Sequence, residues 1–403
     1  MKGTTSAGTP AYLKNLNEWT LLERIIADGP LSRAELSRRT GLSKPTVSSA
    51  ILQLLERGLV RETGRGDNSQ GRKSTLLEFN RTCYYVIGID LGATRIRMAL
   101  GDLEGQICGF RQAPMPGEGV QGAELQALII AEAEALLREQ GVTWHSIQAA
   151  TIGIPGIVDT ASGKVSQLVS PLPGAEESLS RDQLNALLPV RIETENDVNL
   201  AALAEYSIRH SVDSGSLLYF SLGEGTGGGL VLDGAIFRGF RGAAGEFANM
   251  TLRGERVEEI LSAGGLMRLA ARFAGEVGEK KGRTLKESIT SPERVIEQAR
   301  SGDPAAMAVM DAYCDLLAEA IINVCAVIAP ETVVLGGGIG CNGDVLLPRL
   351  ESRLSGFASR PSLDVTRHQE KDVVLGAIQT AVQAALRNIR DAYQSLSPAN
   401  NTN

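Results

Sequence analysis

The residues most capable of chemistry stand in a short turn that follows an apolar run at residues 85–89. Asp90, Gly92 and Thr94 occupy alternate positions there. Glycine lets backbone N–H groups approach an anion, threonine offers a hydroxyl, and an aspartate at a strand end can hold Mg²⁺ through water. The turn could therefore bind an anionic group together with a metal ion. The same residues could also form only a hairpin with a strained glycine, and the turn alone leaves both interpretations open.

Two further glycine clusters also follow apolar strands. Gly225, Thr226 and Gly227 separate the segment LLYFSLG from LVLDG, and Gly337 and Gly338 follow the segment TVVL. An apolar strand followed by a glycine turn, repeated at three well-separated points, is hard to explain as chance packing. The repetition predicts an α/β region whose turns have a functional use.

A different chemistry stands near the N-terminus, where small polar side chains fill the first turn of a predicted helix. Such side chains can enter the major groove of DNA and contact bases or phosphates, and basic residues beside them would meet the phosphates. The proposed DNA contacts are Arg38, Ser43, Lys44, Pro45, Thr46, Ser48, Ser49, Arg72 and Lys73.

The elements around this turn predict a winged helix-turn-helix. Ser32 and Glu35 form a capping box before a helix at residues 33–40, which ends at Gly41. Ser43 caps a further helix that runs to about Arg57. Residues 58–60 and 74–79 flank a polar, glycine-rich stretch and predict a β-hairpin wing. The alternative is a protein-interaction helical module whose polar face is merely solvated.

Composition and charge agree with a DNA-binding head on a different body. The 403 residues carry a net charge of −7, but residues 1–80 have twelve Lys/Arg against eight Asp/Glu, a net +4 that leaves −11 for the rest. The N-terminus lacks the apolar region of a signal peptide, and no apolar run could span a bilayer. The five cysteines are scattered with no CxxC pair. We therefore expect a cytoplasmic protein with reduced thiols and no membrane partner.

Taken in order, the three glycine turns resemble the sugar-kinase/actin-type ATPase fold, in which two α/β lobes enclose a nucleotide and a sugar. More specifically, the chain resembles the ROK family, which contains bacterial sugar kinases and sugar-responsive transcription factors. The resemblance covers about residues 14–390, and its matching stretches are residues 88–94, 152–159, 195–197, 201–205, 223–229, 242–246 and 330–338. It implies an α/β fold in which an N-terminal winged helix-turn-helix precedes two actin-like lobes, as in the family's xylose, N-acetylglucosamine and glucose-linked repressors.

The resemblance also assigns residues to a sugar site between the lobes. Asn196 and Asp197 would bind sugar hydroxyls, and in kinase members the aspartate is the general base. Glu246 matches a glutamate that contacts the sugar, and Glu258 matches a second one. Asp197 could instead serve only as the N-cap of the helix VNLAALAEY. The nucleotide site, vestigial or active, would comprise Asp90, Gly92, Thr94, Gly225, Thr226, Gly227, Gly337 and Gly338.

The main departure from the family pattern lies after Glu246. Zinc-containing members have a histidine three residues later and then a CxCGxxGC loop, but this chain has Asn249 and a short, cysteine-free segment at residues 249–258. A tetrahedral zinc site needs four N/S ligands, which this segment does not supply. We expect no zinc and no other cofactor, with Mg-ATP required only if the protein is a kinase.

We expect a flexible tail at residues 1–12, the winged helix at 13–80, a first lobe at 81–195 that includes a C-terminal helix at 372–393, and a second lobe at 196–380. A single helix-turn-helix reads few base pairs, so a homodimer on a palindromic double-stranded operator is the economical assembly, with a tetramer as the other option.

The sequence therefore predicts a transcriptional regulator, with repression as the expected mode, of genes for sugar transport or catabolism. A sugar or sugar phosphate in the cleft would control it, without enzymatic activity. Two alternatives stay open: an ATP-dependent sugar kinase with an appended DNA-binding domain, for which Asp197 would be catalytic, and a regulator that answers to a partner protein and keeps a vestigial cleft.

Overall fold

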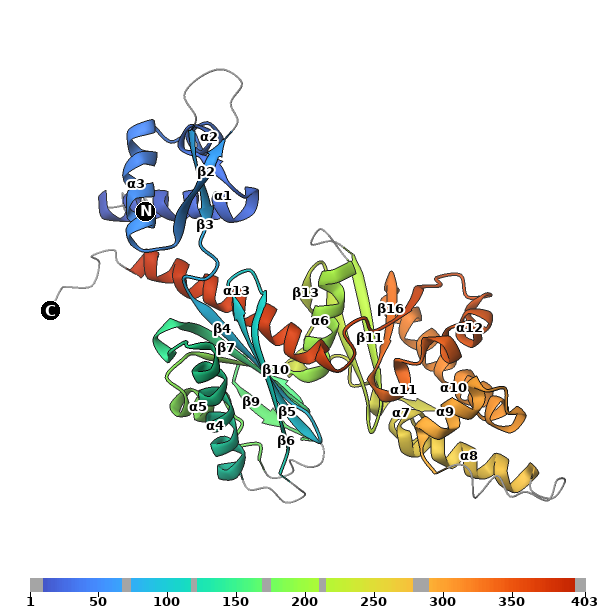
Figure 1. Cartoon of the computed structure of the whole chain (residues 1–403). Helices are drawn as coiled ribbons and strands as arrows, with labels where there is room; N and C mark the ends of the chain where they lie inside the picture. The colour runs from blue at the N-terminus through green and yellow to red at the C-terminus, as the bar shows by residue number, and fades with distance from the viewer. Residues whose placement is uncertain are drawn as a thin grey trace, which may run out of the picture.

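The structure is a computed structural model that describes residues 10–66, 74–116, 122–168, 175–209, 215–277 and 290–395. A small N-terminal head stands on a larger body of two lobes (Figure 1). The tip of the expected wing, with Arg72 and Lys73, lies outside the described residues, as do residues 1–9.

The head is a winged helix-turn-helix. Its elements are α1 (Pro10–Asp28), β1 (Leu31–Ser32), α2 (Arg33–Thr40), α3 (Lys44–Glu56), β2 (Val60–Gly66) and β3 (Ser74–Phe79), with the strands in the order β1-β3-β2. The capping box of Ser32 and Glu35 is present, and Gly41 ends α2 at φ 72°. The helix α1 begins at Pro10, inside the flexible tail expected at residues 1–12, and its buried side chains Leu21, Leu22 and Ile25 pack in the core of the head.

The first lobe is a five-stranded mixed sheet in the order β10-β7-β4-β5-β6. Its strands are β4 (Tyr85–Leu91), β5 (Arg95–Asp102), β6 (Ile107–Pro114), β7 (Ile147–Ile154) and β10 (Ile192–Asn196). The helices α4 (Gly122–Gln140) and α5 (Arg181–Leu187) cover one face and share a buried apolar cluster with the strands. A short hairpin of β8 (Ile157–Asp159) and β9 (Lys164–Ser166) follows β7.

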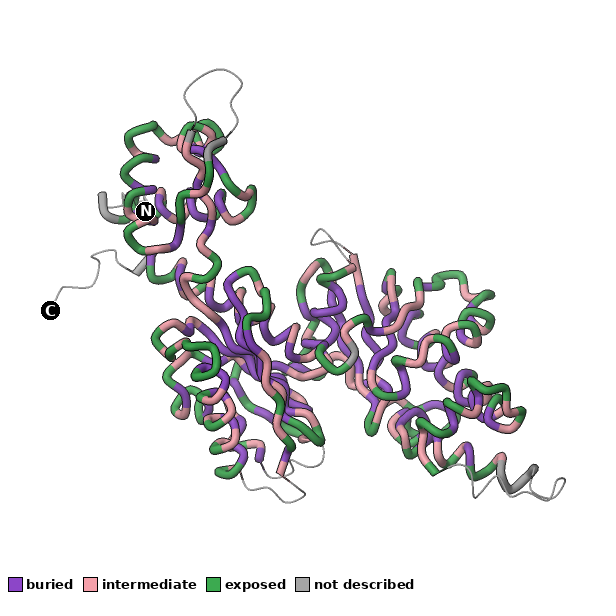
Figure 2. Tube along the Cα trace, viewed as in Figure 1, coloured by how far each residue is buried: buried purple, intermediate pink, exposed green. Residues whose placement is uncertain are grey.

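The second lobe has a five-stranded sheet in the order β13-β12-β11-β16-β17. Its strands are β11 (Ser216–Leu222), β12 (Thr226–Leu232), β13 (Ala235–Ile236), β16 (Thr332–Gly336) and β17 (Ser362–Val365). Its helices are α6 (Asp197–Arg209), α7 (Val257–Leu261), α8 (Ala263–Val277), α9 (Pro292–Arg300), α10 (Pro304–Ile328), α11 (Gly337–Gly340) and α12 (Gly343–Leu354). The buried residues lie along both sheets and along the helices packed on them (Figure 2).

Glycines 227–229 lie inside β12, whereas the sequence suggested a loop. Glycine is needed there because a Cβ on Gly228 would lie 2.0 Å from the Phe247 ring and one on Gly229 2.6 Å from the Val198 carbonyl oxygen. Close approach of neighbouring elements, and not turn geometry, accounts for these glycines. No helix in the described ranges is long and apolar enough to cross a membrane.

The C-terminal helix α13 (Asp372–Ser395) packs on β4 and β7 of the first lobe and against α6 of the second. The contacts are close, since a Cβ on Gly376 would lie 2.0 Å from the carbonyl oxygen of Leu200 and one on Gly88 2.7 Å from that of Val374. The far end of α13 runs beneath the head (Figure 1). One helix thus contacts both lobes and the head.

The contact between α13 and the head is partly polar. The Tyr393 ring lies 6.3 Å from that of Trp19 in α1, and the Arg57 guanidinium lies 4.6 Å from the Tyr393 ring centre. Arg57 also pairs at 3.6 Å with Glu18, which is fully buried. Burial raises the pKa of Glu18 despite the opposing charges of Arg57 and Lys14.

A buried polar cluster joins the second lobe to the start of α13, where the chain returns to the first lobe. Thr366 Oγ1 lies 2.8 Å from Glu205 Oε1 and 2.5 Å from Asp372 Oδ2, and the Tyr219 hydroxyl donates to Asp372 at 2.7 Å. One hydroxyl proton cannot serve two carboxylates, so both contacts are hydrogen bonds only if one carboxyl is protonated. Burial raises the pKa of Asp372 to about 6, which favours that proton.

Candidate functional site

A cleft of about 570 Å³ opens between the lobes, and turns from both lobes line it. The first lobe contributes the β7–β8 turn and the β10–α6 junction, while the second contributes the β11–β12 turn and the segment from residue 246 to α7. All four residues expected to bind sugar line this cleft: Asn196, Asp197, Glu246 and Glu258.

Asn196 caps α6 and faces the cleft. Its Oδ1 accepts from the Asn199 N–H at 2.9 Å, and its Nδ2 donates to the Gly156 carbonyl at 3.0 Å. The cap expected at Asp197 is therefore formed by Asn196, because Asn196 is the residue placed three positions before a free N–H. The carboxamide keeps one lone pair and one hydrogen for a ligand.

Asp197 is the first residue of α6, and its Oδ1 accepts from the Val198 N–H at 2.9 Å. Burial raises the pKa of Asp197 to about 7, and the charges of Asp90 and Glu246 add to the rise. Burial also raises the pKa of Glu246. An aspartate that titrates near neutral pH can bind a hydroxyl strongly and can also take its proton.

Glu258 lies in the first turn of α7 and reaches back to the glycine turn of β11 and β12. Its Oε2 accepts from the Thr226 N–H at 2.8 Å. This contact joins a residue expected in the sugar site to one expected in the nucleotide site. The N–H of Thr226, which could have contacted a phosphate, is occupied by a carboxylate.

The first glycine turn is also occupied by the protein's own groups. Arg97 Nη1 donates to Asp90 Oδ2 at 3.1 Å, and Arg97 Nη2 donates to Glu370 at 2.9 Å. The Gly92 N–H donates to the Arg95 carbonyl at 3.0 Å. Asp90, expected to hold Mg²⁺ through water, and the Gly92 N–H, expected to approach an anion, thus each have a partner on β5 in this structure.

The other residues expected to bind a nucleotide lie partly in the cleft and partly outside its lining. Gly225, Thr226 and Gly227 line the cleft. Gly337 has φ 78°, and the N atom of Gly338 lies 3.6 Å from the position of a Cβ on Gly223, so the third turn packs on the second. Thr94 is exposed in its hairpin, and neither it nor Gly337 and Gly338 belong to the cleft lining.

Asn249, at the position of the histidine in zinc-containing proteins, is exposed and accepts a hydrogen bond from Arg256 Nη2 at 2.8 Å. Arg256 lies in the short hairpin of β14 (Thr251–Leu252) and β15 (Glu255–Arg256) that replaces the longer loop. The described part of the chain contains no group of three His, Cys, Asp or Glu side chains placed to hold a metal ion.

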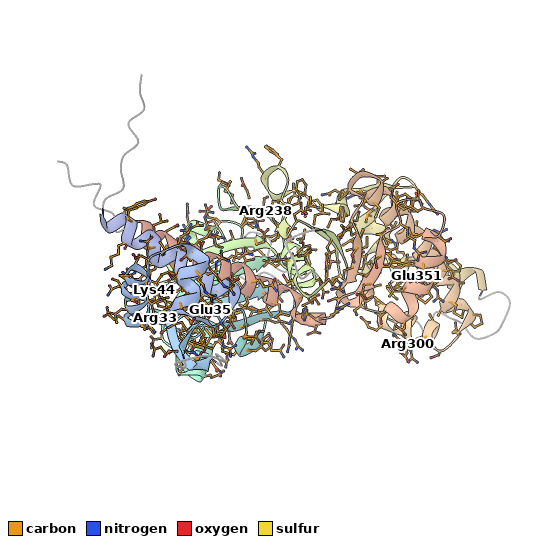
Figure 3. All side chains as sticks on the ribbon, turned by 90° about the horizontal axis from the view of Figure 1, so that it is seen from above. Arg33, Glu35, Lys44, Arg238, Arg300 and Glu351 are labelled. Atoms are coloured by element: carbon orange, nitrogen blue, oxygen red, sulfur yellow. The ribbon has the colours of Figure 1, made fainter. Side chains whose placement is uncertain are left out.

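On the head, the first turn of α3 is exposed. Lys44, Pro45, Ser48 and Ser49 face solvent, whereas Val47 and Ile51 on the opposite side are buried. Figure 3 shows Lys44 on the outer part of the head, well away from Arg238 beside the lobes. Arg38 is also exposed and faces Glu35 at 3.9 Å.

Two of the expected DNA contacts have a structural task as well. Ser43 accepts from the Thr46 N–H at 3.3 Å, and the two hydroxyls lie 2.8 Å apart. Ser43 and Thr46 therefore cap α3, whereas Lys44, Ser48 and Ser49 take no part in capping the helix.

The sequence profile of the ROK family matches residues 86–384, well over half of the chain. The chain belongs to the ROK family. The profile of the MarR family matches residues 15–69, which form most of the head.

Relatives and solved structures agree with this assignment. This ROK chain is 26% identical over 398 residues to the xylose repressor of Caldicellulosiruptor bescii, covering 94% of this chain and 98% of the relative. It resembles the crystal structure of a ROK family transcriptional regulator, a homolog of the E. coli MLC protein, with a TM-score of 0.75, 21% identity and coverage of 95% and 99%. A ROK family glucokinase from Streptomyces griseus, solved with glucose and AMPPNP, has a TM-score of 0.59 and 24% identity and covers 74% of this chain and 99% of its own. Both structures share the fold of this chain, the first over 95% of its length and the second over 74%.

Some residues of this ROK site escaped the sequence analysis. Arg97 stands directly opposite Asp90 in the β4–β5 pairing, so counting across the hairpin could have found it. Glu195 is 2% exposed, and its Oε1 accepts from the Asn196 N–H while its Oε2 accepts from Arg238 Nε at 2.6 Å. Its place beside Asn196 was a signal, but Arg238 lies on another lobe and no local pattern indicates it.

Proposed function

We propose that this ROK chain is a DNA-binding transcriptional regulator that represses genes for sugar transport or catabolism, and that a sugar or sugar phosphate in the cleft controls it. The exposed polar turn of α3 supports DNA binding. The likeness to a xylose repressor over 94% of the chain supports the same combination of head and lobes.

The observation that carries the proposal is that the groups a kinase would use for phosphates are already paired. Arg97 pairs with Asp90, and Glu258 accepts from the Thr226 N–H. A nucleotide would have to break both interactions before Mg²⁺ and phosphates could bind. Asn196, Asp197 and Glu246 keep access to the cleft, so the arrangement favours binding of a polyol over phosphate transfer.

The proposed mechanism is linkage between the cleft and the head. Ligand in the cleft favours one interlobe angle, and α13, anchored at the lobe junction, moves the head accordingly. Its 24 residues make a rod about 36 Å long. A switch from mostly bound to mostly released DNA needs about 5.5 kcal/mol of differential ligand affinity, which two subunits would share.

The assembly and the cellular setting are part of the proposal. A homodimer would place two α3 helices on a palindromic operator, and a tetramer would bridge two such sites. Reduced cysteines fit the cytoplasm. We propose that the protein holds no structural zinc, since Asn249 stands at the position of the histidine ligand and accepts a hydrogen bond from Arg256. Elemental analysis of the purified protein tests this proposal, and one zinc per chain would contradict it.

The test is a DNA-binding titration with and without sugars, in the absence of nucleotide. Operator DNA should be bound without sugar and released when a cognate sugar is added, while the Asp197→Asn variant should bind DNA equally but respond poorly. Its matched control is Asp182→Asn, an aspartate in the first turn of α5. Operator binding that no sugar alters contradicts the proposal.

The second candidate, a sugar kinase with an appended head, is favoured by one observation: burial raises the pKa of Asp197 to about 7, which suits a general base. A kinase consumes ATP when sugar is present. We expect ATP turnover to be weak or undetectable, and robust sugar-dependent turnover that Asp197→Asn abolishes would favour the kinase.

A further inference from the structure

We infer that the cleft selects an uncharged, unphosphorylated sugar and rejects its phosphate esters. This inference rests on the proposed function, because it names the ligand class of the same cleft. It is carried by the balance of charges and free donors around the site.

Carboxylates dominate the lining of the cleft. The four that line it come from four different segments: Asp197, Glu224, Glu246 and Glu258. Among the described residues of the lining, Arg256 is the single positive side chain, and its Nη2 donates to Asn249. A phosphate ester brings between one and two negative charges into this surplus, in a cleft that is partly shielded from water.

Arg97, on the strand that follows the first glycine turn, is already paired with carboxylates. Arg97 is 14% exposed, and its two terminal nitrogens donate to Asp90 and Glu370. The three side chains together carry a net charge of −1, so they add to the negative field of the cleft. Asp90 is close enough to Asp197 to raise the pKa of Asp197, so its charge acts on a residue of the cleft lining.

Two backbone donors of the glycine turns are also taken. Glu258 accepts from the Thr226 N–H at 2.8 Å, and the Arg95 carbonyl accepts from the Gly92 N–H at 3.0 Å. A phosphate at either turn would need to displace a carboxylate or break a hairpin hydrogen bond. These two N–H groups therefore offer no compensation for the repulsion of the lining.

The same lining suits a neutral sugar. Each ionised carboxylate accepts hydrogen bonds and donates none, and sugar hydroxyls supply donors without charge. Charge-assisted hydrogen bonds to carboxylates are about twice as strong as neutral ones. Asn196 adds one free donor and one free acceptor, which matches the dual character of a hydroxyl.

The experiment compares neutral sugars with their esters. Binding of D-xylose, D-glucose and N-acetyl-D-glucosamine, and of xylose 5-phosphate, glucose 6-phosphate and N-acetylglucosamine 6-phosphate, is measured by calorimetry at pH 8 on the full chain, alongside sugar-induced release of operator DNA. We expect at least one neutral sugar to bind at least tenfold more tightly than its own ester.

A charge variant tests the cause. Glu224→Gln removes one lining charge from an exposed residue and should narrow the preference for the neutral sugar, severalfold at low salt. Glu259→Gln, on the same lobe but outside the cleft lining, is the matched control and should leave the ratio unchanged.

The outcomes separate the inference from the proposed function. A phosphate ester that binds more tightly and releases DNA overturns the inference while the regulator remains. Equal ratios in Glu224→Gln and the unmutated protein overturn the electrostatic cause. Absence of both binding and DNA release with all six compounds overturns the inference and the proposed function together.

Discussion

Sugar binding should depend on pH through Asp197. Burial, with the charges of Asp90 and Glu246, raises the pKa of Asp197 to about 7. An ionised Asp197 accepts a charge-assisted hydrogen bond from a sugar hydroxyl, whereas the protonated carboxyl forms only a neutral one. Affinity for a neutral sugar should therefore rise as the pH rises through about 7.

The size of the effect follows from the fraction of ionised Asp197. With a pKa of about 7, roughly 10% of the carboxyl groups are ionised at pH 6 and roughly 90% at pH 8. If the ionised form carries the binding, the apparent dissociation constant changes in inverse proportion to that fraction. Binding should strengthen about tenfold between pH 6 and pH 8.

Calorimetry with a neutral sugar at constant ionic strength measures this dependence. In Asp197→Asn the free energy of sugar binding should be weaker by roughly 1.5–3 kcal/mol, and the affinity should not vary with pH. Asp90→Asn removes a neighbouring negative charge, so the midpoint should move to lower pH. A profile of the unmutated protein that is flat from pH 6 to pH 8, or one that keeps its shape in Asp197→Asn, refutes the assignment of Asp197.

Three further predictions concern the rest of the molecule. The pKa of Asp372 is raised from 3.8 to about 6, which stabilises the fold by up to about 3 kcal/mol. This stabilisation is fully present below about pH 4 and is lost as the pH rises through 6. Asp372→Asn should therefore flatten this part of the profile of Tm against pH. Lys44→Ala should weaken binding to operator and random DNA alike and lower the salt slope by about one, while Ser48→Ala should relax sequence preference; salt titrations on both DNAs distinguish them. Tyr393→Ala should leave DNA and sugar binding in place but reduce sugar-induced DNA release, with Tyr393→Phe, which keeps the ring, as the control; full release by Tyr393→Ala contradicts transmission through this contact.

The head was predictable because its signals are local. The capping residues Ser32 and Ser43 and the terminating Gly41 lie within a few residues of the helices they bound, and all three act as expected. The small polar turn of α3 is exposed for the same reason: apolar spacing turns Val47 and Ile51 inward.

The residues that line the cleft could be predicted from the sequence, but their hydrogen-bond partners could not. The resemblance to the family brought Asp197 and Glu258 to one cleft, and the structure agrees. It gave no indication that Glu258 binds the Thr226 N–H, because these residues are far apart in the sequence and their contact depends on the packing of α7 against the sheet. The hydrogen bond between Glu205 and Thr366 joins residues that are even farther apart in the sequence, so it was still less predictable.

Coupling between the cleft and the head depends on whether α13 can slide. A Cβ on Gly376 would lie 2.0 Å from the Leu200 carbonyl of α6, and one on Gly88 would lie 2.7 Å from the Val374 carbonyl of α13 itself. Backbones in such contact cannot slip past each other by a fraction of a turn without collision, so α13 can only move with the elements on which it packs. Under the proposed mechanism, a change of interlobe angle at Asp372 would therefore reach Tyr393 and the head by movement of α13 as one body with the elements on which it packs.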